Sequence, residues 1–209
     1  MRYDPLRHHR RSIRLRGHDY AQAGEYYVTL CVKDRESLLG EILGDRVELT
    51  RIGEIVKECW EGIPKHFSNA VLDEFVIMPN HVHGIVILVD RVGTRHAVSQ
   101  PAAESQLHAL PQLEIPSREQ FGKPVCGSLS TIMRSFKSAA SKRIHSEGYS
   151  AFAWQSRFYE HIIRDGRDGD RIRKYIANNV SKWSEDKENP EHDLVETNRP
   201  DSTLEMSIL

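Results

Sequence analysis

Apolar and polar residues alternate in several short stretches of the chain, and this pattern predicts β-strands. The stretch 26–32 (YYVTLCV) is rich in β-branched and aromatic residues, which favour a strand. Residues 36–49 are expected to form a hairpin or a short strand pair. Two further strands are expected over 71–77 and 83–89, joined by a turn that contains Pro-Asn, and the stretch 160–163 also has strand character.

Segments whose apolar residues have helical spacing lie between these strands. The stretch 50–63 begins with a threonine N-cap and places its apolar residues on one helical face, and 129–145 repeats that pattern. Asp168 or Asp170 is expected to cap a last helix that ends near Trp183. Interleaved helices and short antiparallel strands predict an α+β fold in which helices pack against an antiparallel sheet.

The length and the charge distribution suggest one domain between two charged ends. The chain has 209 residues, which fit one domain, and its net charge of -1 hides a strong asymmetry. Residues 1–16 hold six arginines and one acid, whereas residues 184–209 hold eight acids and two bases. We therefore expect a basic arm over 1–19, a domain over 20–183 with a flexible insertion at about 91–127, and an acidic, disordered tail over 184–209. The basic arm suits phosphate binding, although solvated ends, or ends that meet each other, explain the charges equally well.

Several protein classes are excluded by composition. The longest apolar run, 85–89, is far too short to span a bilayer, so no membrane association is expected. Three cysteines without CxxC spacing argue against a disulfide scaffold and against a cysteine zinc site, and they fit a reducing cytoplasm. The N-terminus has no apolar signal core, and no P-loop is present, so we expect a cytoplasmic protein without a nucleotide cofactor.

The sharpest candidate site is the pair His81 and His83. In an extended strand these two side chains point to the same side of the sheet and form half of a metal site, or they are two satisfied histidines at a sheet surface. Tyr175 and Asn179 have i, i+4 spacing and share one face of a helix. Asn179 could supply a third ligand and Tyr175 a nucleophile one turn away, or both simply pack this helix against the sheet.

Five segments carry a resemblance to a known family. The segment 75–84 (FVIMPNHVHG) resembles the HUH motif of the REP-associated tyrosine transposases, which belong to the HUH superfamily of single-strand nucleases. Four other segments resemble, in the expected order, the family's first strand, its middle helix, its WQ…H-x-I-R segment and its Tyr-x-x-x-Asn helix: 24–29, 128–138, 154–164 and 175–179. One departure is Val180, since family members usually have proline after the asparagine.

This resemblance implies a ferredoxin-like, RRM-like antiparallel sheet backed by helices, the HUH nuclease fold. It implies His81, His83 and Asn179 as ligands of Mg2+ or Mn2+, and Tyr175 as the nucleophile that forms a 5′-phosphotyrosine and frees a 3′-hydroxyl. Tyr159 is a rival nucleophile, but the residue four positions on is Ile163, which is no ligand.

The implied activity is that of a transposase, a DNA strand transferase and endonuclease that cleaves and rejoins single-stranded hairpin DNA. The protein would be cytoplasmic and nucleoid-associated, as a monomer or homodimer. Eight basic residues are the expected DNA contacts: Arg10, Arg11, Arg14, Arg134, Lys137, Lys142, Arg143 and Arg157. Three alternatives remain open, namely a domesticated hairpin-DNA-binding protein that does not cleave, a metal hydrolase without a tyrosine intermediate, and a structural domain with two core histidines.

Overall fold

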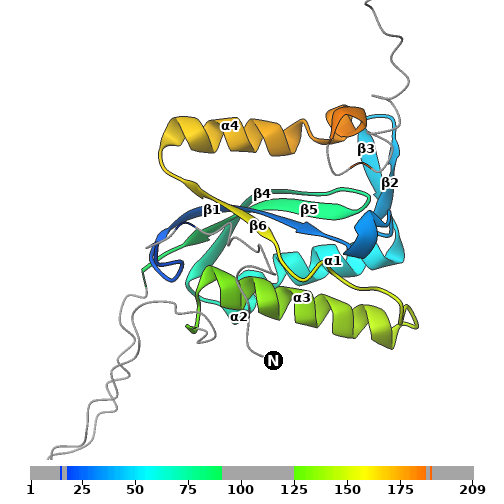
Figure 1. Cartoon of the computed structure of the whole chain (residues 1–209), viewed down its shortest axis with the longest axis horizontal. Coiled ribbons are helices and arrows are strands. Elements are labelled where there is room, and N and C mark those ends of the chain that lie inside the picture. Colours follow the sequence, from blue (N-terminus) through cyan, green and yellow to red (C-terminus); the bar gives the residue numbers. More distant parts are fainter. Residues whose placement is uncertain (1–14, 16–17, 91–124, 187–188, 190–209) are drawn as a thin grey trace, which may run out of the picture.

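The computed structural model of the chain describes residues 15, 18–90, 125–186 and 189 (Figure 1). Its centre is an antiparallel sheet of four strands in the order β4-β5-β1-β6. The strands are β1 (Gly24–Cys31), β4 (Ala70–Ile77), β5 (His81–Leu88) and β6 (Tyr159–Ile163). Helices connect β1 to β4 and β5 to β6, so these four strands have the βαββαβ arrangement of a ferredoxin-like fold. The predicted fold class is confirmed.

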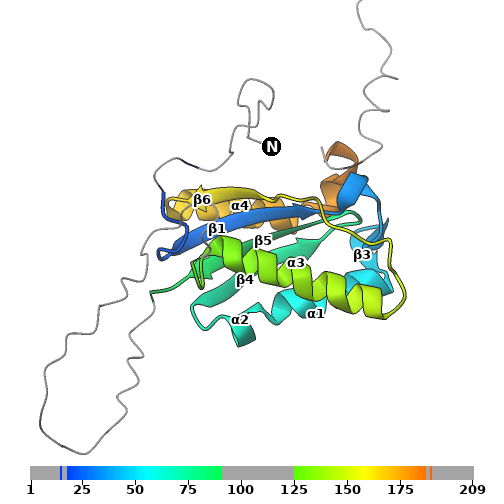
Figure 2. The same ribbon diagram turned by 60° about the horizontal axis from the view of Figure 1, so that its bottom comes forward.

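Helices cover both faces of the sheet. Figures 1 and 2 show α1 (Arg51–Glu61), α2 (Ile63–His66) and α3 (Leu129–Ser146) on one face and α4 (Gly166–Ala177) on the other. A separate hairpin, β2 (Gly40–Leu43) and β3 (Arg46–Leu49), precedes α1, and two short 3-10 helices, η1 (Lys33–Arg35) and η2 (Val180–Glu185), follow β1 and α4. In the part of the chain that the structure describes, no helix is long and apolar enough to cross a bilayer.

Burial on both faces follows from the alternation of side chains along the strands. Tyr26, Val28 and Leu30 of β1 are fully buried in the core that the sheet forms with α1 and α3. The intervening Tyr27 belongs to a second, smaller cluster that includes Ile176 of α4. Because helices cover both faces of the sheet, the central strand β5 is apolar on both faces over much of its length.

The predicted helix ends agree with the structure at the start of α1 and differ at both ends of α4. The Thr50 side chain accepts a hydrogen bond from the backbone N–H of Gly53 at 3.2 Å, so the predicted N-cap of α1 is confirmed. The prediction for α4 was wrong at both ends. Its cap is Asp165, which accepts from the backbone N–H of Asp168 at 2.9 Å, and the helix ends at Ala177. Two asparagines, which are weak helix formers, follow before η2 begins.

The charged ends and the insertion that the sequence predicts lie almost wholly outside the described residues. Among the described residues of the predicted tail are 184–186, which were expected to be disordered. They form the end of η2 and its C-cap. This segment packs beside β5, because Trp183 lies against His81 with a ring-centroid distance of 5.9 Å.

Candidate metal and tyrosine site

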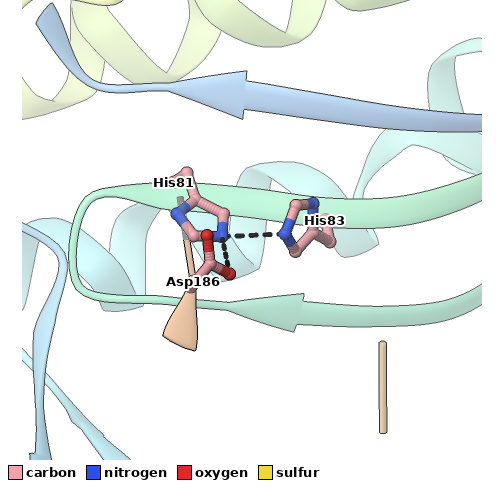
Figure 3. A group of neighbouring side chains, drawn as sticks. All are labelled: His81, His83 and Asp186. Atoms are coloured by element: carbon pink, nitrogen blue, oxygen red, sulfur yellow. Dashed lines mark hydrogen bonds and ion pairs between the residues drawn. The ribbon is translucent and has the colours of Figure 1, made fainter. Parts of the chain in front are cut away.

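His81 and His83 lie at the start of β5, on the face of the sheet that α4 covers. Both are buried, and their Nε2 atoms are 2.9 Å apart (Figure 3). The pairing of β5 with β1 sets this position, since His83 lies opposite Thr29 and His81 opposite Cys31. The predicted orientation of the two imidazoles toward one side of the sheet agrees with this geometry.

The outer nitrogen of each imidazole is held by a neighbouring side chain. His81 Nδ1 donates to Asn80 Oδ1 at 2.8 Å, and Asn80 is itself oriented because its Nδ2 donates to the carbonyl of Arg35. His83 Nδ1 lies 2.7 Å from the Tyr27 hydroxyl and 2.9 Å from Thr29 Oγ1. The Nε2 atoms are therefore the ones that face each other, as in metal sites where the second ring nitrogen fixes the ligand's orientation.

Asp186, which the sequence did not predict as a ligand, joins His81 and His83 in a group of three side chains that could bind a metal. Its side chain is 6% exposed, and its Oδ2 is 3.9 Å from His81 Nε2. The ligand atoms of His81, His83 and Asp186 lie within 4.8 Å of one another, so this buried group could hold a metal ion. The local sequence around Asp186 is acidic and polar, and the one contrary signal was the large apolar Trp183 just before it.

Tyr175 of α4 lies next to the histidine pair of β5. Its hydroxyl is 3.4 Å from His83 Nε2, and its side chain remains 46% exposed, so water reaches it. Two ion pairs of Arg173 hold this part of α4 over the sheet, one with Asp73 of β4 and one with Glu25 of β1. The structure thus brings the predicted nucleophile to the predicted ligands, while its role in catalysis stays a prediction.

Asn179 is buried just beyond the end of α4. It is 2% exposed, and within the described residues its Oδ1 accepts no hydrogen bond. A buried amide oxygen without a partner is unfavourable by about 1–3 kcal/mol, so such an atom commonly marks a position where an ion or water binds. Its role as the third ligand also stays a prediction.

Comparison with known proteins agrees with this architecture. No family model matches the chain. A protein of Haemophilus influenzae (strain ATCC 51907 / DSM 11121 / KW20 / Rd), described as uncharacterized, is 36% identical over 185 residues, which cover 88% of this chain and 96% of the relative. The chain belongs to the family of this Haemophilus protein.

The fold is also that of a solved protein of known type. A REP-associated tyrosine transposase, solved bound to a REP hairpin, superimposes with a TM-score of 0.51. The match covers 90% of this chain and 89% of the transposase at 18% sequence identity. The resemblance that the sequence motifs predict is therefore confirmed at the level of the fold, and this chain is a REP-associated tyrosine transposase-like protein in its architecture.

Burial keeps both histidines of this site neutral. Desolvation, with a smaller contribution from the positive charge of Arg35, lowers the pKa of His81 to about 3. The pKa of His83 is also well below its usual value, mainly through burial and further through His81. A neutral imidazole is the form that binds a metal.

The donor set fits a divalent cation. Two imidazole nitrogens and the carboxylate of Asp186 are buried together, and the amide oxygen of Asn179, between α4 and η2, is buried without a hydrogen-bond partner among the described residues. Oxygen ligands suit Mg2+ and Mn2+, whereas imidazoles suit softer metals such as Zn2+ and Fe2+. The residues therefore support a metal, and they leave its identity open.

Four of the predicted DNA-binding residues lie away from this site. Arg134, Lys137, Lys142 and Arg143 belong to α3, on the opposite face of the sheet from α4 (Figure 2). Arg143 forms an ion pair with Glu58 of α1. Lys137 donates to the backbone carbonyls of Gln155 and Arg157 and so holds the loop before β6. Arg10, Arg11 and Arg14 lie outside the described residues, and DNA contacts by all these side chains stay predictions.

Proposed function

We propose that the protein is a metal-dependent tyrosine transposase and endonuclease that binds single-stranded hairpin DNA and cleaves and rejoins it through a phosphotyrosine at Tyr175. The observation that carries this proposal is the 3.4 Å approach of the Tyr175 hydroxyl to His83 Nε2, next to a buried group of ligand-type side chains. The fold shared with a tyrosine transposase supports it, and the REP hairpin bound by that protein suggests the kind of DNA.

Tyr175 suits a nucleophile better than the two other tyrosines nearby. Burial raises the pKa of Tyr27, and this hydroxyl is already within hydrogen-bonding distance of His83 Nδ1 and Thr29, so it stays protonated. Tyr159 lies on β6, and its ring contacts Tyr27 at a centroid distance of 6.3 Å. Tyr175 combines proximity to His83 Nε2 with exposure to water, which can take up the phenol proton.

The reaction is a transesterification. The phenolate oxygen of Tyr175 forms a bond to the scissile phosphorus, and the bond from phosphorus to the 3′-oxygen breaks. The 3′-oxygen takes up a proton and leaves as a hydroxyl, while the downstream strand stays on the protein as a 5′-phosphotyrosine. A 3′-hydroxyl can reverse this attack because the phosphodiester energy is conserved, so no ATP is needed.

The buried donors explain the metal requirement. A divalent ion held by His81 and His83, with Asn179 and Asp186, would polarise a non-bridging phosphate oxygen and offset the charge that grows in the transition state. Burial keeps the imidazoles neutral and their Nδ1 partners fix the rings, so the protein itself prepares the site for this ion. Mg2+ and Mn2+ are our proposed cofactors.

Hairpin DNA is the proposed partner, with a basic arm that includes Arg10, Arg11 and Arg14, together with Arg134 and Lys142 of α3, as electrostatic contacts. The two α3 residues are exposed. The non-cleaving alternative is less favoured. Binding DNA alone does not require an exposed tyrosine beside buried residues that can bind a metal, whereas cleavage through a phosphotyrosine does.

An adduct assay tests the proposal directly. The probe is a pool of single-stranded oligonucleotides, each with a palindromic hairpin between random flanks, labelled at either the 3′ or the 5′ end. With MnCl2 or MgCl2, we expect a band of protein-linked DNA on a denaturing gel that carries the 3′ label only. EDTA and Tyr175→Phe should each abolish the band, whereas Tyr149→Phe, an exposed tyrosine after α3, should keep it.

Two outcomes would contradict the proposal. Cleavage without a protein-linked product, at a rate that Tyr175→Phe leaves unchanged, would indicate a metal hydrolase. Hairpin binding without any adduct in either metal would indicate the non-cleaving protein.

A further inference from the structure

A cavity of about 280 Å³ opens next to the proposed site, between the β6 edge of the sheet and α4. Six residues line it: Tyr27, Tyr159, His161, Arg171, Ile172 and Tyr175. Tyr175 belongs to both the cavity and the proposed site, so a molecule in the cavity lies beside the phenol. None of the other lining side chains has a part in the chemistry described above, apart from the contact between Tyr27 and His83.

Aromatic side chains form one wall of the cavity. Tyr159 is 50% exposed and Tyr175 is 46% exposed, and the ring of Tyr27 contacts both, with centroid distances of 6.3 and 6.2 Å. Large apolar side chains gathered in one exposed hollow commonly mark a ligand site. Tyrosine rings are also the usual platforms on which unpaired bases of single-stranded nucleic acid stack.

His161 and Arg171, which also line the cavity, belong to a hydrogen-bonded network with Asp168. His161 Nε2 lies 2.8 Å from Asp168 Oδ2, and the other carboxylate oxygen accepts from Arg171 Nη2 at 2.6 Å. The hydrogen bonds from Arg171 and then from His161 lower the pKa of Asp168 to about 2, so this carboxylate is charged at neutral pH. The Arg171 side chain is 73% exposed, and its remaining N–H groups can donate to a phosphate.

The register of β6 against β1 explains why the side chains that line the cavity lie together. His161 of β6 pairs directly with Tyr27 of β1, and Tyr159 pairs with Thr29, so all four side chains face α4. Arg171 and Tyr175 are four residues apart on α4 and therefore project from the same side of that helix. The aromatic wall and the cation thus come from three separate elements that converge beside the proposed nucleophile.

We propose that this cavity binds one unpaired nucleotide of the DNA strand, next to the scissile phosphate, with its base stacked on Tyr159 and its phosphate near Arg171. The inference rests on the proposed function for the identity of the strand. The volume is at the lower end of small-ligand sites, which suits one nucleotide and is far too small for a duplex. Holding this nucleotide fixes the position of the neighbouring phosphate relative to Tyr175.

Crosslinking tests the occupant of the cavity. The full-length Tyr175→Phe protein, which cannot form an adduct, is mixed with hairpin oligonucleotides that carry 5-iodouracil at a random position in the single-stranded flanks. Irradiation followed by peptide mass spectrometry should place the crosslink on Tyr159. A crosslink on other tyrosines with none on Tyr159 would overturn the inference.

Affinity measurements provide the second arm. In the Tyr175→Phe background, Tyr159→Ala should weaken binding of the same single-stranded probe about tenfold by fluorescence anisotropy, whereas Tyr159→Phe keeps the ring and should bind as before. Tyr149→Ala is the matched control, because Tyr149 is 42% exposed but follows α3 on the far face. Arg171→Gln should reduce the slope of log K against log salt concentration by about 1.

The two proposals can fail separately. Unchanged affinity in both Tyr159→Ala and Arg171→Gln, in proteins whose thermal unfolding shows them to be folded, would overturn the nucleotide site while an adduct at Tyr175 still stands. Loss of affinity and a Tyr159 crosslink without any adduct in the wild type would retain the nucleotide site and overturn cleavage.

Discussion

The buried histidine pair should make the stability of the metal-free protein depend on pH. The pKa of His81 is lowered to about 3 in the folded protein, whereas an unfolded histidine titrates near 6.5. Between these values the unfolded chain takes up a proton that folded His81 does not. Stability contributed by the neutral imidazole is therefore fully present above pH 6.5 and is lost as the pH falls toward 3.

The size of this effect follows from the two pKa values. At pH 5.5, His81 should reduce the free energy of unfolding by about 1 kcal/mol relative to pH 7.5, and the loss should reach about 4 kcal/mol near pH 3. The pKa of His83 is lowered in the same direction by burial, so its contribution has the same sign.

Urea unfolding at pH 7.5 and pH 5.5, with EDTA present so that no metal competes with protons, measures this loss. His81→Gln keeps a polar side chain but removes the titration, so its stability should fall by about 1 kcal/mol less than that of the wild type over this interval. His66→Gln is the control, since His66 is exposed at the end of α2, and it should behave as the wild type does. Equal losses in His81→Gln and wild type would disprove the assignment.

Three further outcomes are expected. Gly84→Ala should cost about 3 kcal/mol in urea unfolding, because a Cβ would lie 2.3 Å from the buried Trp60 ring, whereas Gly166→Ala, with open space around it, should be neutral or slightly stabilising; equal effects would contradict this. Thr50→Ala should lower stability by about 1 kcal/mol through loss of the α1 N-cap, and an unchanged urea midpoint would argue against the cap. MnCl2 at a hundredfold excess over its Kd should stabilise the protein by about 2.7 kcal/mol in thermal unfolding. EDTA should reverse this stabilisation, and His81→Gln should lack it. Stabilisation that persists in His81→Gln would place the metal elsewhere.

Local patterns were enough to predict most elements of the fold. The strands β1, β4, β5 and β6 and the helices α1 and α3 agree with the predicted stretches within a few residues. These elements bury one or both faces, so their periodicity is strong in the sequence. His81 and His83 were also predictable as a pair, because alternate residues of a strand necessarily share a side.

The position of Asp186 was not predictable, because its neighbours in sequence are polar and acidic. Its side chain is buried beside His81 only because the chain turns after Ala177, through η2, instead of continuing as a helix. The same turn takes Asn179 beyond the end of α4 and buries it there. Such a turn depends on packing between η2 and the sheet, which no local pattern encodes.

Periodicity and spacing in the chain were sufficient to predict an antiparallel sheet with helices, two imidazoles on one side of a strand, and a phenol on a separate helix. The ferredoxin-like topology was expected only from the resemblance of the motifs to a known family. That the imidazoles and the phenol meet could be seen only in the folded molecule. Tertiary packing and the ion pairs of Arg173 place α4 on the face of the sheet opposite α1 and α3. The neutral state of the histidines and the nucleotide-sized cavity depend on the same packing. Burial and contact between residues roughly ninety positions apart are properties of the whole fold, whereas hydrophobic periodicity is a property of neighbouring residues.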